Sequence, residues 1–112
     1  MLTIGSQKIF YYNKPVSMHK SFDGLSFLVE QSFSAKLLSG SFFVFLNRNR
    51  DKLKILYWDE DGLAIWYKRL EKGHFNVDKT GKTKLTRREF MMVLEGVEPR
   101  HLQKRFSSPK SV

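Results

Sequence analysis

The segment that decides the fold covers residues 47–75 and reads NRNRDKLKILYWDEDGLAIWYKRLEKGHF. It holds two aromatic-rich runs with the character of β-strands, residues 53–58 and 63–69, separated by an acidic turn. The dipeptide Asp61-Gly62 in this turn is typical of a tight hairpin, because glycine adopts a positive φ without steric penalty. We therefore predict that the two runs pair as an antiparallel hairpin.

A third strand precedes this hairpin. Residues 42–46 (FFVFL) form a continuous apolar run that is too short for a helix and is bounded by Gly40 and Asn47. Residues 47–52 (NRNRDK), which follow, cannot lie in a core, because burying so many guanidinium and ammonium groups costs too much free energy. The sequence thus predicts a three-stranded antiparallel meander with a cationic loop projecting into water.

Short extra strands are expected on either side of the meander. Residues 9–12 (IFYY) form an aromatic β-run, and residues 73–77 (GHFNV) have the pattern of a short fourth strand. Along residues 63–69 the side chains alternate between two faces. Leu63, Ile65 and Tyr67 are expected on one face, and Ala64, Trp66 and Lys68 on the other.

Two helices are indicated by apolar residues at helical spacing. The first has Ser21 as a candidate N-cap and Asp23 in its first turn, and should end near Ser34. Its apolar stripe consists of Phe22, Leu25, Leu28, Val29 and Phe33. The second opens with a capping box, Thr86-Arg87-Arg88-Glu89, continues with Phe90, Val93, Leu94 and Val97, and stops at Gly96 and Pro99. The predicted class is α+β, a small antiparallel sheet with two helices packed on it.

The composition indicates a single basic domain. The chain has 112 residues, 41% hydrophobic, and a net charge of +9, which favours polyanionic partners. We expect one domain over residues 1–106 and a disordered basic tail over residues 107–112. The lack of cysteine excludes zinc ribbons, thiol nucleophiles and disulfides. No run approaches the length of a membrane helix and no signal peptide is evident, so a cytoplasmic protein is expected.

Catalytic and metal-binding patterns are weak throughout the chain. Asp59-Glu60-Asp61 is the one acidic cluster, but successive strand residues point to opposite faces, so a solvated turn is expected rather than a metal site. His19, His74 and His101 are isolated from one another. Residues 79–83 (KTGKT) lack the upstream glycine and strand of a P-loop. We therefore predict no catalytic residues, no metal, no cofactor and no enzymatic activity.

Basic residues form the candidate binding site. Its predicted members, as contacts to nucleic-acid phosphates, are Arg48, Arg50, Lys52 and Lys54 on the first hairpin, supported by Lys68 and Arg69. Guanidinium groups match the geometry of phosphate better than ammonium groups do. The alternative is a solvated hairpin tip that Asp51 partly neutralises, since exposed charge is the usual state of a protein surface.

Aromatic residues of the hairpin have two possible roles. Tyr57, Trp58, Trp66 and Tyr67 could stack on unpaired bases. Cross-strand core packing is the more common role of such residues, because strands need them to bury one face. We therefore expect them in the core.

The chain resembles the small accessory proteins of the insertion-sequence family IS sixty-six, called Orf-two or TnpB, which are unrelated to the RNA-guided nuclease of that name. The matching residues and short motifs extend over roughly residues 9–97. They are Met18, Lys20, Phe22-Asp23-Gly24-Leu25, Gly40, Phe43-Val44-Phe45, Asn47-Arg48, Arg50-Asp51, Lys54, Leu56, Trp58-Asp59, Gly62, Lys68-Arg69-Leu70-Glu71, Gly73-His74-Phe75, Leu85, Leu94-Glu95-Gly96 and Val97. The chain departs from the family before the first helix, where it has His19 in place of an arginine.

The resemblance implies an auxiliary role in transposition beside a larger transposase that carries the catalytic carboxylates. It brings no defined catalytic or binding residues. The expected partners are DNA, at the ends of the element, and the transposase of the element, with no membrane. In one mechanism the basic hairpin grips phosphates with little sequence readout. In the alternative, the protein docks on the transposase without binding DNA itself. A small nuclease would need a metal site that the sequence does not contain.

Overall fold

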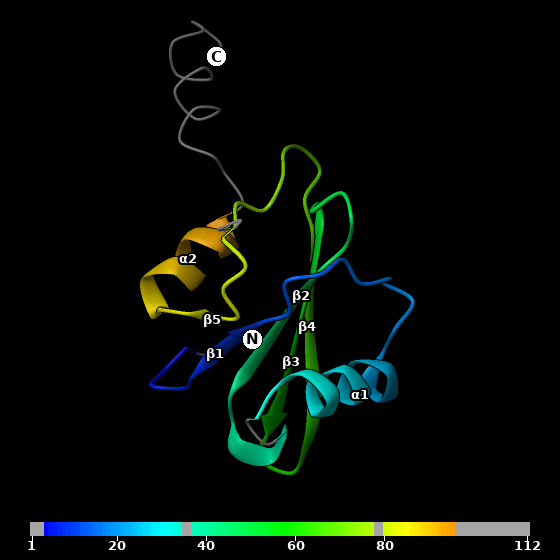
Figure 1. Cartoon of the computed structure of the whole chain (residues 1–112), viewed down its shortest axis with the longest axis vertical. Coiled ribbons are helices and arrows are strands. Elements are labelled where there is room, and N and C mark those ends of the chain that lie inside the picture. Colours follow the sequence, from blue (N-terminus) through cyan, green and yellow to red (C-terminus); the bar gives the residue numbers. More distant parts are fainter. Residues whose placement is uncertain (1–3, 35–36, 78–79, 96–112) are drawn as a thin grey trace, which may run out of the picture.

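The computed structural model describes residues 4–34, 37–77 and 80–95. The predicted tail over residues 107–112, and the helix-stop residues Gly96 and Pro99 together with Val97, lie outside these ranges. Within them the chain forms a five-stranded sheet with one helix on each side, α1 and α2 (Figure 1). Helices long and apolar enough to cross a membrane are absent from the described part of the chain.

The sheet has the strand order β4-β3-β2-β1-β5. The strands are β1 (Ile9–Tyr11), β2 (Phe42–Leu46), β3 (Lys52–Asp59), β4 (Gly62–Arg69) and β5 (Lys84–Leu85). Strands β2, β3 and β4 pair antiparallel, which confirms the predicted meander. Strand β1 pairs parallel to β2, because α1 lies in the connection that returns the chain to the same edge. The α+β class is confirmed, although the sheet is mixed rather than wholly antiparallel.

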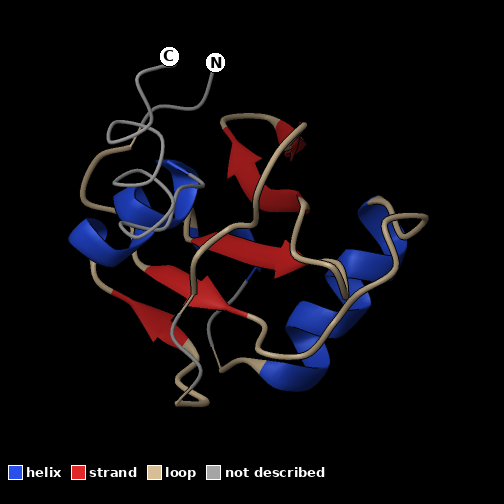
Figure 2. Cartoon of the chain, turned by 90° about the horizontal axis from the view of Figure 1, so that it is seen from above, coloured by secondary structure: helices blue, strands red, loops and turns tan. Residues whose placement is uncertain are grey.

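The helices and strands bury two separate cores. Helix α1 (Phe22–Ser32) packs Leu25 and Val29 on one face of the sheet, and α2 (Arg87–Glu95) packs Phe90 and Val93 on the other. Figure 2 shows the two helices on opposite sides of the strands. A 3-10 turn, η1 (Leu37–Ser39), leads into β2. Every side chain of β2 is buried, as expected for a strand covered on both faces.

The short fourth strand predicted over residues 73–77 is wrong. These residues are not in a strand, although Phe75 and Val77 are buried in the core on the α2 side. The backbone N–H of Phe75 donates instead to the carbonyl of Arg50, at 2.7 Å, so this segment fastens a loop rather than extending the sheet. The fifth strand is β5, which pairs antiparallel with β1 over two residues only.

The β3–β4 turn lies where the sequence predicts it, but its conformation differs. Asp59 is paired with Gly62, which leaves Glu60 and Asp61 as the loop. Glu60 has φ 57°, whereas Gly62 opens β4 and is not among the residues with positive φ. The left-handed conformation therefore falls on a residue with a Cβ, which costs free energy that a glycine would avoid.

The helix ends agree in part with the sequence. The capping box of α2 is confirmed, since the Glu89 N–H donates to the Thr86 hydroxyl at 3.1 Å and the Thr86 N–H to the Glu89 carboxylate at 2.8 Å. Ser21 occupies the N-cap position of α1, but its side chain makes no capping hydrogen bond. Phe22, predicted on the buried stripe, is 44% exposed.

Candidate nucleic-acid interface

Residues 47–52 form a loop whose backbone is fixed by one asparagine side chain. The Asn47 side-chain oxygen accepts hydrogen bonds from the N–H groups of Asp51 and Lys52, at 3.1 and 3.0 Å. Its amide nitrogen donates to the Asp51 carboxylate at 2.7 Å. The Arg50 N–H donates to the Asn47 carbonyl at 3.1 Å, which closes a turn in which Arg50 has φ 56°. We call residues 47–52 the cationic loop.

The cationic loop is also tied to the segment after β4. The Leu70 N–H donates to the Asp51 carbonyl, and the Phe75 N–H to the Arg50 carbonyl, both at 2.7 Å. Nδ1 of His74 lies 3.0 Å from the Asn49 carbonyl oxygen. Because a carbonyl only accepts, Nδ1 must carry the proton in this contact. Arg48 and Arg50 are thus presented from a backbone held on two sides.

Asp51 is used inside the loop rather than at its surface. Its hydrogen bond with Asn47, assisted by the charges of Lys52 and His74, holds the pKa of the Asp51 carboxyl below its usual range. The carboxylate is therefore ionised at neutral pH. The ionised carboxylate serves the internal bonding of the loop, so the arginines project without a carboxylate bound to them in the described contacts.

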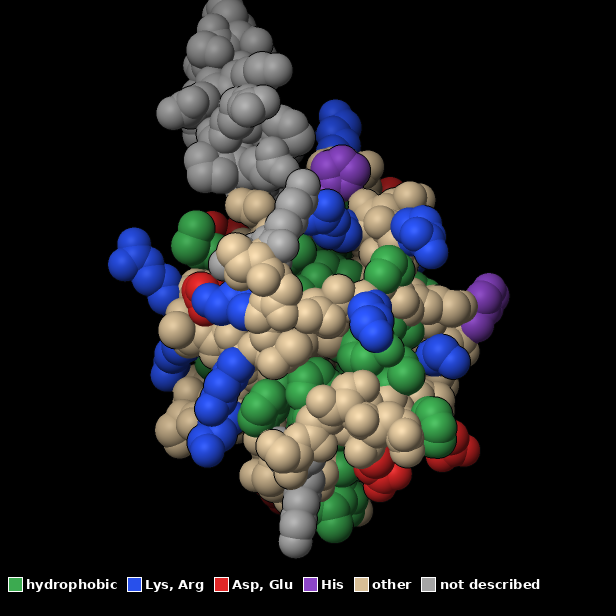
Figure 3. All heavy atoms as spheres, in the orientation of Figure 1, with side chains coloured by type: hydrophobic (Ala, Val, Ile, Leu, Met, Phe, Trp, Pro, Cys, Tyr) green, Lys and Arg blue, Asp and Glu red, His purple; other side chains and the backbone are tan. Residues whose placement is uncertain are grey.

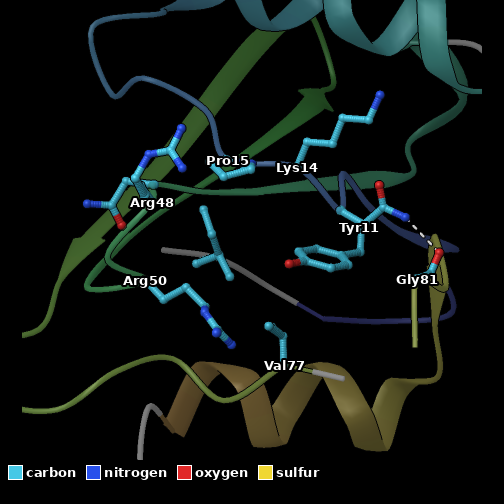
Figure 4. Close-up of a pocket in the computed structure, with 10 residues that line it drawn as sticks. Tyr11, Lys14, Pro15, Arg48, Arg50, Val77 and Gly81 are labelled. Atoms are coloured by element: carbon cyan, nitrogen blue, oxygen red, sulfur yellow. Dashed lines mark hydrogen bonds between the residues drawn. The ribbon is translucent and has the colours of Figure 1, made fainter. Parts of the chain in front are cut away.

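A pocket of about 330 Å³ opens beside the cationic loop. Among the described residues it is lined by Tyr11, Asn13, Lys14, Pro15, Leu46, Asn47, Arg48, Arg50, Val77 and Gly81, none of which is acidic. Figure 4 shows Arg50 and Tyr11 across the pocket from each other, with Arg48 and Lys14 along its other side and the Lys14 side chain extending toward α1. The Asn13 amide donates to the Gly81 carbonyl at 2.6 Å and closes one end. We call this the cationic pocket.

Lys14 is a member of this site that the sequence analysis missed. It lies just after β1, more than thirty residues before Arg48 in the sequence, and is exposed. The parallel pairing of β1 with β2 places the carboxyl ends of both strands at the same edge of the sheet. Residues that follow β1 therefore meet the loop that follows β2. A basic residue two positions after an aromatic β-run was the available signal.

Tyr11 forms an apolar wall of the pocket. Its side chain is buried, and burial raises the pKa of its hydroxyl, while the positive charge of Arg50 opposes that rise. The hydroxyl therefore stays protonated at neutral pH and can donate a hydrogen bond. The pocket is lined by two arginines, a lysine and a tyrosine beside apolar residues, a combination that suits a phosphate group attached to a less polar body.

The six predicted contact residues do not form one cluster. Arg48 and Arg50 lie in the cationic loop, and Lys52 opens β3 directly opposite Arg69 on β4. Arg69 is exposed and pairs with Glu71 at 3.0 Å, also on the surface. These four residues gather at one end of the sheet. Lys54 and Lys68 are engaged elsewhere.

Lys54 is a structural residue. It is only 7% exposed, and its ammonium donates to the carbonyls of Met18 and Lys20, each at 2.8 Å. Burial lowers the pKa of this ammonium, which also lies 4.8 Å from the centre of the Tyr67 ring. Lys54 therefore fastens the segment before α1 to the sheet and is not presented to a phosphate backbone.

Lys68 points to the opposite face, as the alternation predicts. Its ammonium donates to the carbonyl of Leu94, at 3.2 Å, in the last turn of α2. A cation at this end of a helix is favourable because it satisfies an orphan carbonyl and complements the helix dipole. Arg87 is engaged too, since its guanidinium donates to the carbonyls of Ile4 and Gly5.

The remaining basic side chains are distributed widely over the surface. Figure 3 shows lysines and arginines on several parts of one face, with fewer acidic side chains among them. The residues Asp59, Glu60 and Asp61 are exposed at the hairpin turn. In the described ranges, no group of three or more potential ligands among His, Cys, Asp and Glu could hold a metal ion. The positive groups, rather than acidic ones, make up the candidate site.

Comparison with known proteins places the chain in a family. The family model described as IS66 Orf2 like protein matches residues 7–104. Two relatives come from Sinorhizobium fredii strain NGR234. The uncharacterized protein y4jC is 30% identical over 81% of this chain and 80% of its own length, and y4hO is 27% identical over 83% of each chain. No solved structure matches. Because the family model covers most of the chain, this protein belongs to the IS66 Orf2-like family, whose members have an accessory role in insertion-sequence transposition.

Proposed function

We propose that this protein is a non-catalytic accessory factor that holds DNA by its phosphates during transposition of an insertion sequence. The observation that supports this most strongly is the cationic pocket. Lys14, Arg48 and Arg50 come from two separate segments and line one concavity, and none of its described lining residues is acidic. A concave surface lined by charges of one sign concentrates its field there, so this arrangement suits a site that an anion occupies.

The fixed backbone of the cationic loop favours this function. Arg48 and Arg50 approach a ligand without first ordering the loop, because the Asn47 side chain already fixes it. Less conformational entropy is then lost on binding. Lys52 extends the positive surface along β3, while Arg69, already paired with Glu71, has a supporting role.

The expected binding mode has little sequence readout. Contacts to phosphate supply affinity and fix the register of a protein on DNA, whereas base edges supply specificity. We propose the ends of the element as the DNA partner and the transposase of the element as the protein partner, both in the cytoplasm. Specificity for the ends would then come mainly from the transposase.

A second candidate function is a module that docks on the transposase without binding DNA. It is favoured by large apolar side chains on the surface, of which Phe27 is 60% exposed and Leu38 is 63% exposed. Met91 and Met92 on α2 are also exposed. Because α1 and α2 cover opposite faces of the sheet, these side chains offer a partner two separate apolar contacts.

A salt-dependent titration distinguishes the two functions. The protein is titrated against a duplex that carries the terminal repeat and against a scrambled duplex, each at two salt concentrations. The test variant is Arg48→Ala/Arg50→Ala. The matched control, Lys8→Ala/Arg88→Ala, also removes two positive charges, but at exposed positions outside the cationic pocket.

Each phosphate contact contributes about 0.9 to the slope of log K against log salt. The loop variant should therefore flatten the slope by about 2, and the control by much less. Equal losses in both variants would show that net charge alone drives binding. If neither duplex binds at moderate salt, the DNA-binding function is wrong and the transposase becomes the partner to test.

A further inference from the structure

We propose that two copies of this protein pair through strand β4, in antiparallel register about Ile65, to form one continuous sheet. Strand β4 is the last strand on its side of the sheet, next to β3 only. It spans eight residues, whereas the strand at the opposite edge, β5, spans two. Long unpaired edges present a row of N–H and C=O groups that can pair with another chain.

The middle of this edge lacks the usual protection against pairing. Residues 63–67 (LAIWY) carry no charge and no proline, and in the described structure none of them has a positive φ. Natural edge strands avoid association through charged residues, proline or bulges near their centre. The charges of β4 itself, Lys68 and Arg69, lie at its carboxyl end, and the acidic residues Glu60 and Asp61 precede its first residue.

Charge complementarity argues for a second copy of this chain as the occupant. The acidic turn, with Glu60 and Asp61, precedes β4, and Lys68 and Arg69 end it. Two copies related by a two-fold axis run antiparallel, so the acidic end of one copy meets the basic end of the other. With Ile65 opposite its own counterpart, Asp61 of each copy faces Arg69 of the other. Opposite charges on facing strands stabilise the pair.

Neighbouring registers are less favourable. Along an edge strand, the residues whose backbone N–H and C=O groups point toward a new partner alternate with residues whose groups point toward β3. The register between the two copies can therefore shift only by two residues at a time. A shift in one direction shortens the ladder to Gly62–Trp66 on each strand, and a shift in the other sets Glu71 against Asp61 of the second copy. Within one copy, Arg69 pairs with Glu71 on the surface, where ion pairs are weak. Arg69 can therefore leave Glu71 and pair with Asp61 of the second copy.

The pairing has a consequence for DNA. Residue Arg69 lies four positions from Ile65, so the basic ends of the two β4 strands are about 26 Å apart along the sheet. The two cationic loops, one strand further out and beyond these ends, are then separated by about one turn of B-DNA, roughly 34 Å. A dimer of this form could contact two successive stretches of one duplex through its two cationic pockets. Arg69 would then pair with Asp61 of the other copy at the β4 edge.

Engineered cysteines test the register, because the natural chain has none. The variant Asp61→Cys/Arg69→Cys places a thiol opposite a thiol across the dimer, at strand-pair distances that a disulfide can bridge. Within one copy the two positions lie at opposite ends of β4, too far apart to react. The controls are Asp61→Cys and Arg69→Cys alone, whose thiols are distant from their own counterparts in this register.

The expected result is a covalent dimer from the double variant under mild oxidation, with little from either single variant. Sedimentation of the wild-type protein should show a monomer–dimer equilibrium at micromolar concentrations. Equal cross-linking of single and double variants would overturn the register. A wild-type protein that stays monomeric at 100 μM would overturn self-pairing and leave the edge to a strand of another protein. Neither outcome depends on DNA binding, so the two proposals are tested separately.

Discussion

The side-chain nitrogen of Asn47 lies 2.7 Å from a carboxylate oxygen of Asp51, and this contact joins the two ends of the loop that carries Arg48 and Arg50. The same asparagine accepts hydrogen bonds from two backbone N–H groups across the loop. Presentation of the arginines therefore depends on an uncharged residue. A substitution at Asn47 therefore changes the geometry of the loop without changing its charge, so the two contributions to binding can be measured separately.

Replacing Asn47 by alanine should weaken DNA binding although the charge of the protein is unchanged. The variant leaves two backbone donors of the loop without their partner, at a cost of about 1–3 kcal/mol in the free energy of unfolding. Urea denaturation measures the stability, and titration against duplex DNA measures affinity. Asn49→Ala, at an exposed position of the same loop, is the control and should change both quantities little. Equal effects of the two substitutions would show that Asn47 does not order the loop.

Lys54→Met should destabilise the fold without changing the salt dependence of DNA binding. The substitution removes the ammonium that satisfies the carbonyls of Met18 and Lys20, and we expect a loss of about 1–3 kcal/mol in urea unfolding. The salt slope should equal that of the wild type under conditions where both proteins are folded. A slope flattened as much as in Arg48→Ala would show that Lys54 contacts phosphate after all.

Lys14→Ala should weaken DNA binding as much as Arg48→Ala does. Both side chains line the cationic pocket, and each lost phosphate contact reduces the salt slope by about 0.9. Lys8→Ala, an exposed lysine on the other side of β1, controls for net charge. If Lys14→Ala and Lys8→Ala have the same small effect, the pocket is not the binding site and only the cationic loop contacts DNA.

Acid should destabilise the cationic loop through Asp51. Hydrogen bonding to Asn47 lowers the pKa of this carboxyl in the folded state, so its contribution is fully present above the unfolded value of 3.8. The contribution is lost as the pH falls through the lowered folded pKa. Thermal unfolding from pH 6 to pH 2 should show a smaller loss of Tm with decreasing pH in Asp51→Asn than in the wild type. Identical pH profiles would contradict the assignment.

Glu60→Gly should stabilise the protein by about 0.5–1 kcal/mol. Glu60 holds φ 57° in the β3–β4 turn, and glycine removes the steric cost of this conformation at some cost in unfolded-state entropy. Gly62→Ala is the informative comparison, because Gly62 lacks a positive φ and an added Cβ meets nothing within 4 Å. This change should therefore shift stability by less than about 0.5 kcal/mol. Strong destabilisation by Gly62→Ala would move the strained position to the glycine.

The meander and both helices could be predicted from sequence because their signals are local. The apolar run of β2, the alternation along β4 and the capping box at Thr86 are each encoded within a few residues. The pairing of β1 with β2 could not be predicted in this way. Residues 9–12 contain no local signal for which strand they pair with, or whether the pairing is parallel, when the partner is thirty residues away. Strand β5 was not predicted, because two residues are too few to show the alternation of a strand.

The candidate site was predicted in part, for a related reason. Charge and loop position predicted that Arg48 and Arg50 lie in one loop between two strands, and both are in the loop between β2 and β3. Lys54 was predicted as a phosphate contact, because nothing local to it showed that the carbonyl groups of Met18 and Lys20 would bind its ammonium. The position of Lys14 beside Arg48 depends on the parallel pairing, and so became visible only with the sheet topology.

The parallel pairing of β1 with β2 also orders the events of folding. The β2–β3–β4 meander joins neighbours through short connections, whereas β1 reaches β2 only after the segment that contains α1 has closed. Contacts between residues distant in sequence form late, because the entropy of closing a long connection must be lost first. Lys14 should therefore join Arg48 and Arg50 in a late step, so that an incompletely folded chain has the basic hairpin but lacks the pocket.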